Sequence, residues 1–232
     1  MSEWHARITQ TLWQWRGVWL FIAIMLVFRS AIADWNQVPS GSMTPSILAG
    51  DRIVVDKLAY SLRIPFTLQQ LAHWAEPERG DVVTFVSPLD ERLLVKRIIG
   101  LPGDRVALEA NALSINGQTA AYRELSAAEA GIEGGSPHPP QRYFQESILG
   151  ASHLIMLHPE GRSTSNRDLP PSVVPKGHYL VLGDNRDNSE DSRAIGFVER
   201  ERILGRATAV AFSLDYENYY RPRPQRFMAD LH

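Results

Sequence analysis

A chain of 232 residues is long enough to bury a sizeable core, either as one large domain or as one domain with an insertion. Hydrophobic residues make up 44% of the chain and charged residues 22%, so the composition excludes an intrinsically disordered protein. The net charge of −2 leaves no basic excess for a phosphate backbone, and nucleic acid is not expected as a partner. The absence of cysteine excludes disulfides, thiolate zinc sites and a cysteine nucleophile.

An uncharged apolar segment covers residues 17–28 near the N-terminus. At a rise of about 1.5 Å per residue this segment covers ~18 Å, against ~30 Å for a hydrocarbon core, so a spanning helix must include flanking residues. Tryptophans before the segment and Arg29 after it suit the membrane interface. We therefore predict a single transmembrane anchor over residues 17–34. The basic residues before it predict a cytoplasmic N-terminus over residues 1–16.

The same residues also fit a cleavable secretory signal peptide, in which Ala31-Ile32-Ala33 is the cleavage site. Arg29 then stands where a cleavable peptide usually has a small or neutral residue. A buried core helix is a third interpretation, which the lack of a polar stripe disfavours. Both leading interpretations export everything after Asp34, and they differ in whether the exported part stays tethered.

After the apolar segment the hydrophobic runs are short and rich in valine, isoleucine and leucine, as is typical of β-strands. Turn residues separate these runs. Pro102-Gly103 suits a type II turn, and Asn116-Gly117 is the preferred pair for a tight hairpin. We therefore predict a mainly β exported domain with few helices. The expected strands are residues 52–56, 81–86, 92–99, 178–182 and 207–214, with 153–158 as a further strand.

The strand pattern weakens in the middle of the chain. Residues 126–131 favour a short helix, and the glycine- and proline-rich residues 134–140 cannot continue one. We interpret this region as an inserted subdomain or long excursion. The expected organisation is a β-rich catalytic domain whose first part covers residues 35–119, an insertion over 120–175, a second catalytic part over 176–215 and a C-terminal tail over 216–232.

Pro39, Ser40, Gly41, Ser42 and Met43 directly follow the apolar segment. Such residues ordinarily form a linker or a turn. A serine nucleophile needs a base as well as its hydroxyl. This segment alone is therefore compatible with both a linker and an active-site loop.

Two basic residues interrupt the apolar run 92–99. Strand alternation places Lys96 on one face with Leu94 and Ile98, and Arg97 on the other face. Burial disfavours an ammonium ion, lowering a lysine pKa from ~10.4 toward ~7 to 8, and the neutral amine can then act as a base. The alternative is an edge-strand lysine that reaches solvent and discourages aggregation.

A charged loop over residues 183–193 follows the apolar run 178–182. A calcium loop is excluded because no register supplies both the glycine at the sixth position and the glutamate at the twelfth. A solvated loop and a network of ion pairs that fixes the loop both remain open. Such a network would hold Ser189 rigidly.

Three motifs occur in one order after the apolar segment: PSGSM at 39–43 with Gly50-Asp51 behind it, KRIIGLPGD at 96–104 and GDNRDNSEDSR at 183–193. Together they resemble the conserved boxes of bacterial type I signal peptidases. Three boxes in this order are far more specific than any one of them. Residues 105–175 carry no comparable match.

By that resemblance Ser42 is the nucleophile and Lys96 the general base. The Ser40 hydroxyl and the Ser42 backbone N–H would form the oxyanion hole. Ser189 would bind the Lys96 amine and orient it. The structural ion pairs implied near the site are Asp184 with Arg97 and Asp191 with Arg193.

The resemblance implies a membrane-bound serine endopeptidase that removes N-terminal signal peptides from exported preproteins, after small residues of Ala-x-Ala type. It implies no cofactor and no metal, and its expected partners are signal peptides and membrane lipid. The expected location is the bacterial cytoplasmic (inner) membrane, in a single pass, with the catalytic domain on the outer, periplasmic face. An extended chain spans at most ~3.6 Å per residue. Ser42 is therefore expected within about 30 Å of Asp34, where the chain would leave the membrane.

Other hydrolase motifs are absent from the sequence, which has no G-x-S-x-G elbow, no lysine three residues after Ser42 and no H-E-x-x-H. His153 and His158 lack a third metal ligand. Two alternative functions remain: a Ser/Lys peptidase dedicated to one exported substrate, and a non-enzymatic, membrane-tethered β module that binds an exported partner. The apolar residues that suit either the membrane interface or core packing are Leu62, Ile64, Pro65, Phe66 and Trp74.

Overall fold

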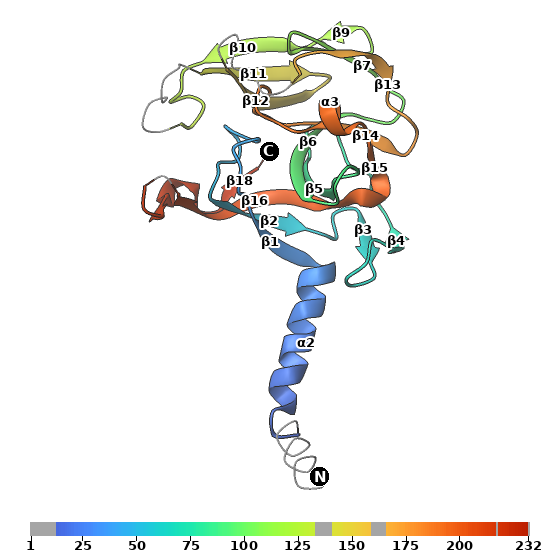
Figure 1. The fold of residues 1–232 in the computed structure, drawn as a ribbon, viewed down its shortest axis with the longest axis vertical. Helices are drawn as coiled ribbons and strands as arrows, with labels where there is room; N and C mark the ends of the chain where they lie inside the picture. Colours follow the sequence, from blue (N-terminus) through green and yellow to red (C-terminus); the bar gives the residue numbers. More distant parts are fainter. Residues whose placement is uncertain (1–12, 133–140, 159–165, 217, 232) are drawn as a thin grey trace.

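The computed structural model describes residues 13–132, 141–158, 166–216 and 218–231. Strands dominate this part of the chain and helices are few (Figure 1), as the short apolar runs predict. Residues 1–12 of the predicted cytoplasmic segment and the glycine- and proline-rich run at 134–140 lie outside the described residues.

The largest sheet brings strands from distant parts of the chain side by side, and its pairs are antiparallel. In spatial order it contains β1 (Ala33–Gln37), β2 (Asp51–Asp56), β16 (Ile203–Asp215), β5 (Val82–Val86), β6 (Leu93–Gly100), β14 (His178–Leu182) and β15 (Val198–Glu199). Two short strands of the tail, β17 (Arg221–Pro222) and β18 (Ala229–Asp230), pair with β16. The five principal expected strands correspond to β2, β5, β6, β14 and β16.

Strand β6 lies inside this sheet, between β5 and β14. Val83 of β5 is the partner of Lys96, and Leu182 of β14 is the partner of Arg97. From Lys96 to Gly100 every residue is buried, because hydrophobic clusters cover both faces. The alternative of an edge-strand lysine is therefore wrong.

Smaller sheets surround the large one. The first has the spatial order β13 (Leu169–Val173), β7 (Arg105–Glu109), β8 (Ala112–Ile115) and β9 (Gln118–Thr119). The second has the order β10 (Ala121–Leu125), β11 (Arg142–Ile148) and β12 (Ala151–Leu157). In the third, β3 (Ser61–Arg63) pairs with β4 (Gln70–His73). The further strand expected at 153–158 corresponds to β12. Residues 126–131 form turns and no helix, because Gly131 takes a left-handed φ of 72° and ends the coil after one turn.

Both predicted turns are confirmed. Asn116 and Gly117 have φ values of 54° and 82°, as a tight hairpin of this type requires, and they connect β8 to β9. Gly103 has a φ of 90°, and the Asp104 N–H donates to the Leu101 carbonyl at 3.0 Å. This second turn follows β6 and leads the chain into β7.

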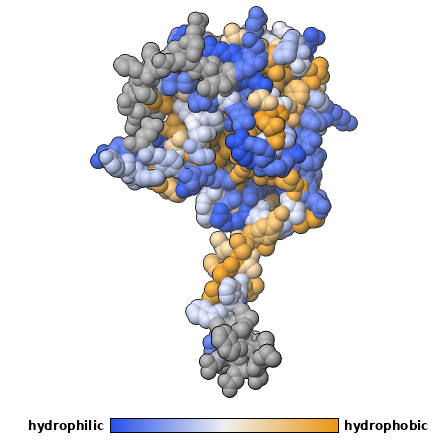
Figure 2. All heavy atoms as spheres, viewed as in Figure 1, coloured by the Kyte–Doolittle hydropathy of each residue, from blue (hydrophilic) through white to orange (hydrophobic). Residues whose placement is uncertain are grey.

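Helix α2 (Arg16–Ala31) extends away from the β domain, and its apolar side chains are exposed along its length (Figures 1 and 2). It ends before the boundary expected at residue 34, since Ala33 and Asp34 already belong to β1. None of the helices in the described ranges combines the length and the apolar character needed to cross a membrane.

A buried ion pair joins the sheet of β10, β11 and β12 to the loop that follows β14. Glu146 of β11 accepts hydrogen bonds from Arg186 Nη1 and from the Tyr122 hydroxyl, both at 2.8 Å. The side chains of Glu146 and Arg186 are almost fully buried. Burial alone would raise the pKa of the Glu146 carboxyl, but the Arg186 guanidinium outweighs burial and holds that pKa well below its usual range.

Glu146→Gln should lower the free energy of unfolding at pH 7 by about 3 to 5 kcal/mol, because it leaves the Arg186 charge buried without its counter-ion. Urea denaturation measures the change. Glu124→Gln is the matched control, since Glu124 pairs with Arg142 at 2.7 Å on the exposed face of the neighbouring strand. An equal loss in the two variants would contradict the role of burial.

Candidate active site

Ser42 lies in the loop between β1 and β2, and this loop is held by its own apolar residues. Met43 and Ile47 are buried in a cluster with Val38 and Ile53. The Ile47 N–H donates to the Met43 carbonyl at 2.9 Å, which makes a compact turn directly after the serine. The segment is therefore a turn that is anchored in the core through Met43, while Pro39 and Ser40 at its start are exposed.

The Lys96 amine reaches this loop from β6. Its Nζ donates to Ser42 Oγ at 2.7 Å and to the Val95 carbonyl at 3.0 Å. Lys96 is only 3% exposed. The structure thus brings together two residues that lie far apart in the sequence, in the arrangement of a nucleophile and its base.

The surroundings of Lys96 favour its neutral form. Burial lowers the pKa of the Lys96 ammonium to about 8, while the carboxylates of Asp191 and Asp184 act in the opposite direction. An amine with such a pKa is partly deprotonated near neutral pH and can accept a proton from a hydroxyl.

Most of the loop over residues 183–193 is buried: Asp184, Asp187 and Asp191 are each at most 1% exposed, whereas Asn188 and Glu190 are exposed. Arg97 binds the Asp184 carboxylate with two hydrogen bonds, from Nε at 2.9 Å and from Nη2 at 2.7 Å. Arg97 Nη1 also donates to the Gly80 carbonyl at 2.7 Å. Of the two interpretations of this loop, the ion-pair network is confirmed and the solvated loop is wrong.

The second predicted ion pair fixes the far end of the same loop. Arg193 donates to the Asp191 carboxylate from Nε at 2.9 Å and from Nη2 at 2.8 Å. The same carboxylate accepts the Gly183 N–H at 3.0 Å and caps the short helix α3 (Ser192–Ile195). Burial opposes the ionisation of Asp191, but Arg193 outweighs burial and lowers the pKa of this carboxyl. The two ends of the loop are therefore tied to each other.

Asn185, which was not among the predicted site residues, connects this loop to the nucleophile. Its side-chain Nδ2 donates to the Gly41 carbonyl at 3.0 Å, and its backbone N–H donates to the Ser42 carbonyl at 3.1 Å. Its Oδ1 lies 3.1 Å from His158 Nε2. The available signal was its place inside the GDNRD run, but an uncharged amide between acids gives no pattern of its own.

The remaining predicted residues lie close to this centre. Ser40 Oγ is 3.5 Å from Ser42 Oγ, a long distance for a hydrogen bond between hydroxyls, and Ser40 is exposed. Ser189 is buried against Gly183. A Cβ on Gly183 would lie 2.5 Å from the Ser189 Cβ and 2.6 Å from the Ser42 carbonyl oxygen. Only glycine therefore lets Ser189 and the Ser42 loop meet at this point.

Comparisons with known proteins point to one family. The family model described as signal peptidase, peptidase S26, matches residues 12–212. A signal peptidase I of Pseudomonas fluorescens is 37% identical over 204 residues, covering 82% of this chain and 68% of that protein. The chain belongs to the signal peptidase I family. The signal peptidase I of Aquifex aeolicus is 32% identical, covering 84% of this chain and 82% of that protein.

A crystal structure of a signal peptidase I from Enterococcus faecalis V583 is 31% identical to this chain. The match covers 58% of this chain and 98% of that one, with a TM-score of 0.35.

Membership of the signal peptidase I family makes the chain a serine endopeptidase. The non-enzymatic binding module is therefore wrong.

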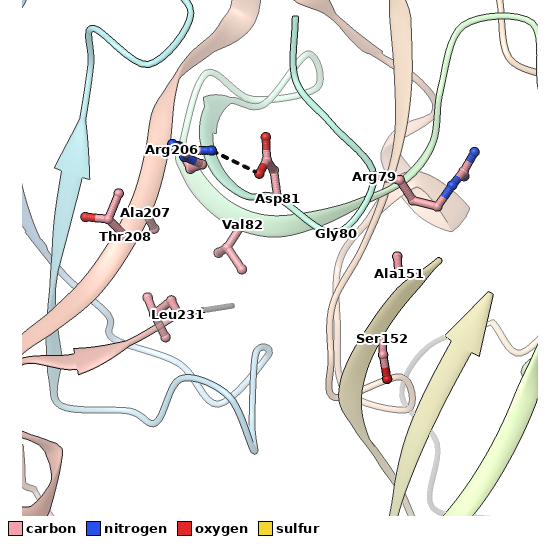
Figure 3. A pocket seen from close by; sticks show the side chains of 10 residues that line it. All are labelled: Arg79, Gly80, Asp81, Val82, Ala151, Ser152, Arg206, Ala207, Thr208 and Leu231. Atoms are coloured by element: carbon pink, nitrogen blue, oxygen red, sulfur yellow. Dashed lines mark ion pairs between the residues drawn. The ribbon is translucent and has the colours of Figure 1, made fainter. Parts of the chain in front are cut away.

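A cavity of about 330 Å³ lies between the large sheet and the start of β12 (Figure 3). Asp81 and Arg206 face each other across part of its wall, with 3.6 Å between Oδ1 and Nη1. Neither Ser42 nor Lys96 lines this cavity, so it is separate from the serine–lysine pair of this signal peptidase I family member. Within the ranges that the structure describes, no group of three or more His, Asp or Glu residues is placed to hold a metal ion.

Asn185→Ala should lower turnover of a peptide substrate about 10- to 100-fold, because a shift of the nucleophile by about 1 Å is enough for such a loss. Turnover and melting temperature are measured together. Asn188→Ala is the control, since Asn188 lies in the same loop with an exposed side chain. Equal turnover in the two variants would show that the Asn185 amide does not position the Ser42 loop.

Proposed function

We propose that Ser42 is the nucleophile and Lys96 the general base of a serine endopeptidase, and that no metal or cofactor takes part. The observation that carries the proposal is the 2.7 Å hydrogen bond between the buried Lys96 amine and the Ser42 hydroxyl. As a member of its family, the chain removes signal peptides from exported preproteins.

The chemistry follows from a base that is neutral before the reaction. Lys96 accepts the Ser42 proton as Oγ attacks the scissile carbonyl, and the resulting ammonium protonates the leaving amine. The Ser42 N–H and the Ser40 hydroxyl stabilise the oxyanion. Ser189 orients the Lys96 amine from its buried place beside Gly183.

The ion pairs act on geometry and take no part in proton transfer. Asp184 is fully engaged by Arg97, and Asp191 by Arg193, so neither carboxylate is available as a second base. Cleavage after small residues of Ala-x-Ala type is part of the proposal and rests on the family resemblance. A peptidase dedicated to one substrate would have the same dyad and a narrower substrate range.

Membrane lipid is the second proposed partner, with α2 as the anchor and the β domain on the outer face of the bacterial cytoplasmic membrane. Apolar side chains of α2 such as Phe21 and Ile24 are more than half exposed, which suits a lipid environment. The Phe66 N–H donates to Ser30 Oγ at 2.7 Å, so the hairpin of β3 and β4 meets the end of α2. Phe66 and Trp74 are exposed there and would lie in the membrane interface.

Ser42→Ala and Lys96→Met should each abolish release of mature protein from a preprotein, because either change removes one half of the dyad. Residual cleavage is expected about 10³-fold or more below wild type. The assay follows the size of the preprotein product by electrophoresis in detergent. Lys176→Met replaces an exposed lysine and should retain full activity. Cleavage that survives in the Lys96 variant would exclude it as the base.

The kcat/KM value should rise with pH and level off above about 8, because Lys96 must be deprotonated to accept the Ser42 proton. The carboxylate of Glu190 favours the Lys96 ammonium, so Glu190→Gln should move the midpoint of this rise to lower pH. Glu199→Gln, an exposed acid outside this group, should leave the midpoint unchanged. A midpoint near the ordinary lysine pKa would contradict the proposal.

A further inference from the structure

Strand β12 forms one edge of its three-stranded sheet, and the first half of this edge has no partner strand among the residues that the structure describes. Its inner side pairs with β11 over the whole strand. On its outer side the Met156 N–H donates to the Asp184 carbonyl at 2.8 Å, and the Arg186 N–H donates to the Met156 carbonyl at 3.1 Å. The loop over residues 183–193 therefore covers only the end of the outer edge.

The backbone groups at the free part of this edge point outward. In an antiparallel pair every second residue directs both its N–H and its C=O to the partner strand, and the residues between direct theirs to the other side. Met156 directs both groups outward, so Ser152 and Leu154 do the same by alternation. Within the described ranges, neither residue makes a backbone hydrogen bond on that side. The edge thus offers donors and acceptors to a further strand.

Two cavities border this free edge. Ser152 and Leu154 line a cavity of about 300 Å³, together with Pro45 and Ser46 of the loop between β1 and β2. Ser152 also lines the cavity of about 330 Å³ in Figure 3, where Leu231 of the tail lies across from it. Because Ser152 and Leu231 line both cavities, the two adjoin along the start of β12. Together they are called the β12 slot below.

The space at the other end of the same edge is filled by a single segment of the chain. Asn185 forms a parallel bridge with Met156, and its N–H donates to the Ser42 carbonyl at 3.1 Å. One segment therefore lies there between β12 and the loop of Ser42. The β12 slot lies between the same two elements, beside Ser152 and Pro45. Because strands in a sheet lie about 4.8 Å apart, one more extended strand beside β12 fits this arrangement.

The lining of the slot suits a peptide of variable sequence. Edge strands bind extended peptides through main-chain hydrogen bonds, which do not depend on the side chains of the peptide. The slot offers polar side chains, such as Gln145 and Arg226, beside the apolar Leu154. His153 also lines it and is 5% exposed, and its Nδ1 has no hydrogen-bond partner among the described residues. A peptide backbone or a polar side chain would supply that partner.

The place of the slot indicates which peptide reaches it. Figure 1 shows β12 on the side of the β domain that lies away from α2. With α2 in the membrane, as proposed, a signal peptide held there approaches Ser42 from the side of α2. The polypeptide after the scissile bond then continues away from α2, toward β12. Pro45 and Ser46 follow Ser42 closely in the same loop, so the slot begins near the nucleophile.

We propose that the β12 slot binds the mature part of a preprotein, as an extended strand that pairs with Ser152 and Leu154. Their main-chain hydrogen bonds hold the residues that follow the scissile bond while Ser42 attacks it. Varied mature sequences are accepted because the backbone of the substrate is bound. The inference rests on the proposed function.

Ser152→Pro tests the pairing, because proline removes the N–H that points into the slot and leaves the bonds to β11 in place. Two peptides are compared in detergent micelles. Both carry the same signal sequence and cleavage site; one ends two residues after the scissile bond and the other continues for about twelve. We expect wild type to cleave the longer peptide with a kcat/KM at least about fivefold higher, since two or more main-chain hydrogen bonds are gained.

The measured quantity is the ratio of the two kcat/KM values, long over short. Ser152→Pro should lower this ratio to about one. Ser152→Ala is the matched control, since it removes the hydroxyl and keeps the N–H, so its ratio should stay well above one. Melting temperatures show whether each variant is folded.

Cross-linking provides a measurement that does not depend on a change in β12. The full chain carrying Ser42→Ala is mixed with long peptides that hold a benzophenone amino acid at successive positions before and after the scissile bond. After irradiation, mass spectrometry identifies the residues that are linked. We expect positions after the bond to link to residues 151–154, and positions before it to link elsewhere.

Cleavage of the short peptide by wild type shows that the dyad is active, so failure of the proposed function is seen separately. The inference is overturned if wild type cleaves both peptides equally well, or if Ser152→Pro slows both by the same factor and leaves the ratio as in wild type. It is also overturned if residues 151–154 link to positions before the bond or to none. The cross-linking result decides the question if Ser152→Pro does not fold.

Discussion

The buried ion pair between Arg97 and Asp184 is the constraint on which the active site depends. Arg97 follows Lys96 on β6, and Asp184 precedes Asn185, which binds the loop of Ser42. One pair of charges therefore fixes the strand that carries the base relative to the loop that carries the nucleophile. Burying two charges costs free energy, and their attraction offsets this cost only when the geometry is good. The main effect of the pair is therefore to fix the relative positions of the strand and the loop, and its contribution to stability is smaller.

The same loop also sets the basicity of Lys96. Burial alone would push the pKa of the amine further down, and the carboxylates of Asp191 and Asp184 restore part of it, leaving a value of about 8. Arg193 acts against them and shares the Asp191 carboxylate. If the acids of this loop had no arginine partners, they would raise the Lys96 pKa and keep the amine as an ammonium ion. If the loop had no acids, the Lys96 pKa would fall further and the amine would be a weaker base. Acids that are paired with arginines give a Lys96 pKa between these two limits.

The sequence predicted the elements whose pattern is local. The strands follow from alternating apolar residues, and the turns at Gly103 and Asn116 follow from residues that tolerate positive φ. Long-range pairings have no local signal, so the interior place of β6, the buried Glu146 and the return of the tail as β18 against β16 could not be predicted. Ser42 and Lys96 were predicted only through their joint occurrence with the loop at 183–193, because neither residue alone differs from a turn serine or a surface lysine.

The connection between α2 and the active site contains no flexible linker. Strand β1 begins at Ala33, pairs with β2 as far as Gln37 and leads into the buried Val38, so Ser42 is joined to the end of α2 through hydrogen-bonded and packed residues. The extended chain from Ala33 to Ser42 covers at most about 32 Å. A bond that reaches Ser42 must therefore lie at a fixed height above the end of α2. If α2 lies in a membrane, as proposed, the site would act on bonds just outside the bilayer because of its position.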